Sequence, residues 1–170
     1  MKSLNELLEN LSVGDKKFYC REIANWNNDQ KTQLEELANL FLSVGAKNPI
    51  SWAYSEITED VPQLGRFLLL KHMHGIIKDT NGIIVEASEF DDDIQNKMNL
   101  ISEVLGEELL NKMLYAYGKA ILSGVISFID EGNYSAKTDG VSWHLCETTA
   151  KGESTGRVIQ GLHEDFYDFE

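Results

Sequence analysis

The sequence predicts a mainly α protein, an irregular bundle of four to six helices closed by a small C-terminal β-hairpin or irregular segment. Apolar residues recur with a period near 3.6 through most of the chain, which is typical of amphipathic helices. After Gly132 the pattern changes to alternation, which is typical of a half-buried strand. With 170 residues, 42% hydrophobic and 25% charged, the chain has a globular composition. We therefore expect a single domain over 1–170, with a helical part over about 1–131 and a hairpin part over about 132–170.

Two short helices are predicted in the first fifty residues. Leucines at helical spacing mark the first of them, which we expect Gly14 to end. The second spans Leu34 to Phe41 and is expected to stop before Gly45 and Pro49. The polar segment 21–30 between them is rich in Asn and Asp, which favour caps and turns over helix interiors.

A third helix is expected to begin at the segment 60–63, where Asp60 can accept the N–H of Gln63. Pro62 is compatible with a first helical turn because that turn needs no N–H donor. The helix is expected to end at Asn81 and Gly82. The β-branched segment 83–85 then predicts a short extended stretch.

From Ile94 to Glu131 the apolar positions again keep helical spacing, and Gly106 is a candidate break between two helices. The most apolar stretch, 113–129, includes Lys119 and is shorter than the ~20 residues that a membrane span requires. We interpret it as a core helix.

The C-terminal part predicts a hairpin. Val141, Trp143 and Leu145 alternate with polar neighbours, and the segment 157–160 is the expected partner strand. The intervening 152–156 matches G-x-S-x-G, but no strand-to-helix turn on a parallel sheet accompanies it. We therefore interpret this motif as an ordinary loop.

The net charge of −13 and the sequence pI near 4.7 limit the classes of partner. An acidic surface repels phosphate backbones and anionic lipid headgroups, so nucleic acid and membrane are unfavourable partners. A basic or neutral protein is favoured instead. Two widely separated cysteines, Cys20 and Cys146, and an N-terminus without a signal-peptide pattern predict a cytoplasmic protein.

Four histidines are candidates for chemistry. His72 and His74 project about 200° apart on a helix, so they cannot easily share one ion. We expect His72 on the apolar face and His74 on the polar one. His144 and Cys146 are expected on one strand face, too far apart for a nucleophilic pair unless they lean together.

The candidate site residues belong to two acidic segments. The expected partner-binding residues lie around residue 92 and near the C-terminus, and they are Asp91, Asp92, Asp93, Glu164, Asp165 and Phe166. The competing interpretation of the first cluster is a solvated N-terminal turn of the next helix, where the helix dipole favours acids. A metal site is not the primary expectation; the alternative ligand set comprises His144, His163 and Glu164, completed by Asp165 or Cys146.

Two hypotheses for function follow. The first is a non-catalytic interaction protein that binds a basic protein through an acidic face, as inhibitors and immunity-type proteins against nuclease toxins would. The second is an enzyme of unknown reaction with a metal or acid/base site in the C-terminal segment. Common cofactor and metal motifs are absent from the sequence, so no cofactor is predicted and the first hypothesis is favoured. The sequence does not indicate an oligomeric state.

Overall fold

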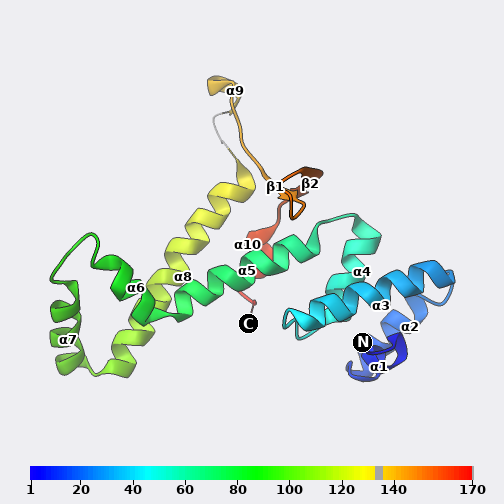
Figure 1. Ribbon diagram of the computed structural model, residues 1–170, viewed down its shortest axis with the longest axis horizontal. Helices are drawn as coiled ribbons and strands as arrows, with labels where there is room; N and C mark the ends of the chain where they lie inside the picture. Colours follow the sequence, from blue (N-terminus) through cyan, green and yellow to red (C-terminus); the bar gives the residue numbers. More distant parts are fainter. Residues whose placement is uncertain (133–135, 170) are drawn as a thin grey trace. The chain divides into compact units, whose positions relative to one another are not determined.

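A computed structural model describes residues 1–132 and 136–169 (Figure 1). The protein is mainly α with a C-terminal two-stranded antiparallel hairpin, as predicted; seven of the described helices have seven residues or more, beyond the four to six expected. The chain divides into two compact units. Unit 1 comprises Met1–Leu68 and Cys146–Val158, and unit 2 comprises Leu69–Leu145 and Ile159 onward. The single domain expected from the chain length stays a prediction.

Unit 1 contains four helices ahead of α5, and their bounds are α1 (Leu4–Glu9), α2 (Val13–Glu22), α3 (Asn28–Ser43) and α4 (Pro49–Glu59). Their starts have local causes. Ser3 and Glu6 form a capping box at α1, and Asn27 and Gln30 form another at α3. Pro49 occupies the first turn of α4, where its missing N–H costs no hydrogen bond.

The core of unit 1 lies where α3 packs on α4. Phe41 is fully buried between Trp52 and Phe67, with ring centroids 6.1 and 5.8 Å away. Small side chains at Ala38 and Ala53 are also fully buried, which allows the two helices to approach closely. These contacts stabilise the unit through burial of large apolar side chains.

Two expectations for this unit are wrong. Gly14 does not end a helix, because Ser12 caps α2 and Gly14 lies in its first turn. Asp60 does not cap the third helix; it has a left-handed backbone (φ 54°) and ends α4. The carboxylate of Glu56, from α4, accepts the N–H of Leu64 at 2.9 Å instead. A tertiary acceptor therefore replaces the expected local cap of α5 (Gln63–Lys78).

Unit 2 holds the rest of α5 and the later helices, whose bounds are α6 (Thr80–Ala87), α7 (Ile94–Leu105), α8 (Glu107–Glu131), α9 (Ala136–Asp139) and α10 (Leu162–Phe166). Gly106, with φ 84°, separates α7 from α8 as predicted, because this conformation favours glycine. The extended stretch expected at 83–85 is wrong. The carboxylate of Asp79 accepts the N–H of Gly82 and starts α6, which buries Ile84.

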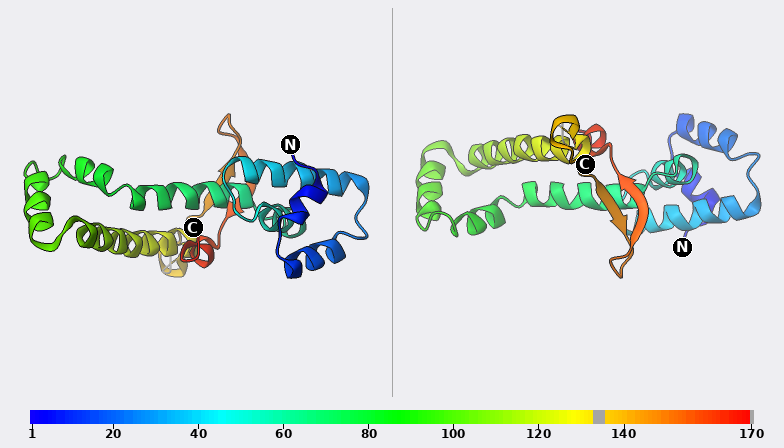
Figure 2. Two further views of the ribbon diagram at one scale, coloured as in Figure 1. Left: turned by 90° about the horizontal axis from the view of Figure 1, so that it is seen from below. Right: turned by 90° about the horizontal axis from the view of Figure 1, so that it is seen from above.

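The hairpin comprises β1 (Leu145–Thr148) and β2 (Ser154–Ile159), seen side by side in Figure 2. It begins later than expected, because Trp143 precedes β1 and donates its indole N–H to the carbonyl of Phe128. Within unit 1, the guanidinium of Arg157 lies 3.1 Å from Glu56 and 3.5 Å from Glu147. The ion pair with Glu56 thus joins the hairpin to α4, and the one with Glu147 joins β2 to β1. The G-x-S-x-G segment forms its turn and the start of β2.

Helix α5 offers a matched test of the core of unit 2. Ile77 is 1% exposed and its neighbour Ile76 is 57% exposed. We expect Ile77→Ala to lower the free energy of unfolding by about 2–5 kcal/mol, because it leaves a cavity. Ile76→Ala should change it by under about 0.5 kcal/mol. Chemical denaturation of the two variants measures both, and equal losses would show that the buried face of α5 is misassigned.

Candidate functional site

The C-terminal helix α10 is attached to α8 through Asp130. One carboxylate oxygen of Asp130 accepts the backbone N–H of His163 and also lies 2.8 Å from its ring nitrogen Nδ1. The Asp130 side chain is 2% exposed, whereas that of His163 is 46% exposed. Because the first N–H groups of a helix lack internal partners, Asp130 supplies the cap that the sequence of α10 lacks.

The other end of α10 is held by two basic side chains. The ring nitrogen Nε2 of His74 lies 2.9 Å from the carbonyl oxygen of Phe166, and Lys119 donates to the carbonyl of Tyr167 at 2.9 Å. The charge of Lys119 is favourable at a helix C-terminus for the same reason that an acid is favourable at its start, whereas His74 contributes a hydrogen bond. Helix α10 is thus fixed at both ends by side chains from α5 and α8. It lies beside the end of α8 in Figure 2.

His74 is buried and lies against the aromatic rings of Phe166 and Phe169. Burial lowers the pKa of His74. The hydrogen bond to the carbonyl of Phe166 opposes this shift, and the nearby charges of Lys119 and Lys78 add to it. The sequence prediction is therefore reversed: His74 is the core histidine and His72 is exposed. One of the two rings is buried and the other is exposed, and which of them is buried depends on the contact with α10.

Asp130 and His163 form the arrangement that most resembles acid/base machinery. A buried carboxylate beside Nδ1 leaves Nε2 as the atom able to exchange a proton, as in catalytic triads. Asp130 was absent from the expected site, since it lies 33 residues before His163 in sequence. The same carboxylate oxygen also caps α10, which is a structural role sufficient to explain the pair.

The alternative metal ligands are not brought together. Among the residues that the structure describes, no group of three or more His, Cys, Asp or Glu could hold a metal ion. His144 is exposed and precedes β1, so it does not share a strand face with Cys146, contrary to expectation. His163 is instead paired with Asp130.

The first acidic cluster is partly engaged in local contacts. Asp91 pairs with Lys97 at 2.6 Å, and this hydrogen bond lowers the pKa of the Asp91 carboxyl. Asp93 precedes α7 and accepts from the side chain of Asn96, while Asp92 is exposed. The arrangement agrees with a solvated start of a helix, the competing interpretation of this segment.

The second acidic segment differs from the prediction at its aromatic residue. Phe166 is fully buried in unit 2, so it is not a surface anchor in this structure. Glu164 is exposed and Asp165 is half-buried. The expectation of an exposed Phe166 is wrong, because the contacts that hold α10 at both ends place this ring against His74.

The largest unexpected feature is an apolar face of α8. Five large side chains recur every four residues and are all exposed; we name them the α8 stripe, and they are Leu109, Met113, Tyr117, Ile121 and Val125. The next row on the same face consists of small residues, Ala116, Ala120 and Gly124, all exposed. A neighbouring face, about 100° further around the helix, buries Ile126 and places Gly118 against Ile77 of α5.

This exposure contradicts the interpretation of 113–129 as a core helix. A helix with apolar residues around most of its circumference is normally buried on all sides. In α8 only one side is covered by the described part of unit 2, so the stripe remains in contact with solvent. Helix α7, which precedes it, buries no side chain fully. The sequence does contain a signal for the exposed stripe, because the apolar residues of α8 cover a wider arc of the helix than one buried face requires.

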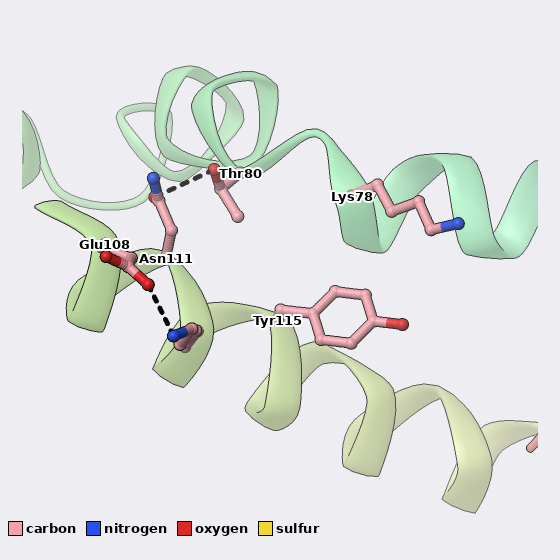
Figure 3. A pocket seen from close by; sticks show the side chains of 6 residues that line it. Lys78, Thr80, Glu108, Asn111 and Tyr115 are labelled. Carbon is pink, nitrogen blue, oxygen red and sulfur yellow. Dashed lines mark hydrogen bonds and ion pairs between the residues drawn. The ribbon is translucent and has the colours of Figure 1, made fainter.

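A hollow of about 400 Å³ lies between the end of α5, the start of α6 and α8 (Figure 3). Thr80 donates to Asn111, and Lys112 pairs with Glu108 at 2.6 Å, so these polar groups bind one another. Lys78 and Tyr115 also line the hollow. It is open to solvent, and its shape does not indicate a particular ligand.

Comparisons with known proteins do not indicate a family or a function for this chain. No protein-family model matches the sequence, and searches of curated proteins and of solved structures give no significant match. None of the described helices is long and apolar enough to cross a membrane.

The burial of His74 predicts a pH dependence of stability. Because its pKa is lowered in the folded state, the unfolded chain binds a proton at higher pH than the folded chain. The contribution of neutral, buried His74 to the free energy of unfolding is complete above the ordinary histidine pKa of about 6.5. It decreases as the pH falls below that value. We expect His74→Gln to flatten the dependence between about pH 7 and pH 5, whereas His72→Gln should retain it. Urea titrations at several pH values measure this, and a flattening by His72→Gln would contradict the assignment.

The Asp130 cap predicts a local loss of protection. Asp130→Ala removes the acceptor of the His163 N–H, so we expect a loss of about 1–3 kcal/mol in stability. Backbone amides of α10 should exchange faster in hydrogen-exchange measurements. The exposed neighbour Glu131→Ala is the matched control and should leave the exchange of α10 unchanged. Unchanged exchange in Asp130→Ala would show that other contacts hold α10.

Proposed function

We propose that this chain is a non-catalytic protein-interaction domain that binds its partner through the α8 stripe. The observation that supports this is the exposure of five large apolar side chains in one continuous row. Contiguous apolar surface of this kind is costly in water and typically marks a protein interface. Tyr117, at 72% exposed, is the most prominent member, and tyrosine is enriched among residues that dominate binding energy.

The charge of the chain favours a basic or neutral partner. A net charge of −13 attracts basic proteins over a range set by the Debye length, about 8 Å at physiological ionic strength. Inhibitors and immunity-type proteins that neutralise basic nuclease toxins belong to this class. Exposed acids such as Asp92 and Glu164 would steer the encounter, and the stripe would supply the short-range contact. A cytoplasmic location accords with Cys20 and Cys146 both being free.

The second candidate is an enzyme that uses His163 for proton transfer. The observation that favours it is the buried Asp130 carboxylate 2.8 Å from Nδ1 of a half-exposed imidazole. An activity of this kind would be abolished by His163→Gln. A variant that loses stability but keeps the activity would assign the pair to the capping of α10 alone.

The proposed interaction predicts a specific sensitivity to charge in the stripe. A partner isolated from the native cells would be identified, purified and titrated against the protein by calorimetry. Ile121→Glu should weaken binding about tenfold or more, because the carboxylate would be desolvated in the interface. Ile76→Glu on α5 is the control, since Ile76 and Ile121 are 57% and 54% exposed. Equal affinities of the two variants would contradict binding through the stripe.

A further inference from the structure

We infer that the occupant of the α8 stripe is a single amphipathic helix of a partner protein, carrying Lys or Arg at both of its ends. The inference rests on the proposed function and specifies the chemistry of the partner.

The dimensions fit a helix. From Leu109 to Val125 the stripe extends about 24 Å at a rise of 1.5 Å per residue. Its large side chains form one ridge along the i, i+4 direction, and the small residues Ala116, Ala120 and Gly124 form the adjacent groove. Ridges of a second helix pack into such grooves. An amphipathic helix of about 20 residues would therefore cover the whole stripe.

The groove is unobstructed. A side chain added at Gly124 would meet no other atom within 4 Å, apart from the neighbouring helix backbone. The same is true of Gly75 on α5, which provides a position of equal freedom away from the stripe. The surface of α8 at Gly124 is therefore free of neighbouring side chains at contact distance.

The ends of α8 determine the charge of the occupant. The helix begins at Glu107 and ends at Glu131, and both of these acids are exposed. Glu108 is paired with Lys112, and the Asp130 side chain is buried against His163. The charge pattern toward a partner therefore comes from Glu107 and Glu131. The basic residues of α8 are engaged elsewhere, Lys112 with Glu108 and Lys119 with the carbonyl of Tyr167. A helix with cations at both ends would complement this pattern, since opposite charges across an interface favour association and fix its register.

The same pattern disfavours a second copy of this chain. Antiparallel pairing of two stripes would place Glu107 near Glu131 of the other copy, and parallel pairing would bring identical acids together. Both arrangements bring like charges together, on chains that each carry a charge of −13. Anionic membranes are disfavoured by the same repulsion.

The test uses the full chain and three synthetic helical peptides of about 20 residues, with fluorescence anisotropy as the readout. The first carries an apolar stripe of Leu and Ala with Lys at both ends, the second has Glu at the ends, and the third keeps the Lys ends but scrambles the stripe. We expect the first to bind about tenfold or more tightly than the other two.

Two variants locate the binding. Gly124→Leu should abolish binding of the Lys-ended peptide by filling the groove, while the matched Gly75→Leu should bind as the unaltered protein does. Circular dichroism confirms that both variants are folded. Sedimentation velocity and flotation with vesicles of phosphatidylcholine and phosphatidylglycerol measure the two competing occupants.

Each outcome decides a different claim. Equal binding of the Lys-ended and Glu-ended peptides, lost in Gly124→Leu, would overturn the basic partner but leave the interaction surface intact. Peptide binding that Gly124→Leu leaves unchanged would contradict both the basic partner helix and the interaction surface. The same conclusion would follow if no peptide binds and the partner has equal affinities for Ile121→Glu and Ile76→Glu. A dimer that Gly124→Leu dissociates, or vesicle binding through the stripe, would replace the partner helix with a second copy or a membrane.

Discussion

Unit 2 depends on the packing of one face of α8 against α5 and α10. Gly118 allows Ile77 of α5 to approach the backbone of α8, and Ile126 is fully buried on the same side. Close approach of this kind gains dispersion and hydrophobic energy together. The side of α8 that makes this contact is buried, and the α8 stripe on the neighbouring face is left exposed.

The contacts at the two ends of α10 show how a very short helix is stabilised. An isolated helix of five residues is unstable in water, because nucleation costs more than its few hydrogen bonds return. Asp130 at its start and Lys119 and His74 at its end satisfy the backbone groups that the helix itself cannot pair. The acidic C-terminal segment is therefore tied to the fold, and its aromatic residue Phe166 contributes to the core.

Charge and apolar surface act over different ranges in the proposed interaction. The net charge of −13 raises the rate of encounter with a basic protein but gives little orientation. The α8 stripe acts only at contact, where burial of apolar area and the i, i+4 spacing determine the geometry. Selectivity would come from combining the two, because a helix lacking either feature would lose one part of the binding free energy.

The sequence by itself determined the helical class, the break at Gly106 and the C-terminal hairpin, because these depend on local periodicity and on backbone conformations that favour particular residues. The sequence did not determine which face is buried in a helix that carries apolar residues on two faces. The burial of His74 rather than His72 depends on Phe166, which lies 92 residues away. Likewise, the cap of α5 comes from Glu56 and that of α10 from Asp130. The exposed stripe on α8 is also a tertiary outcome, since periodicity reports apolar faces but not the partner that each face meets.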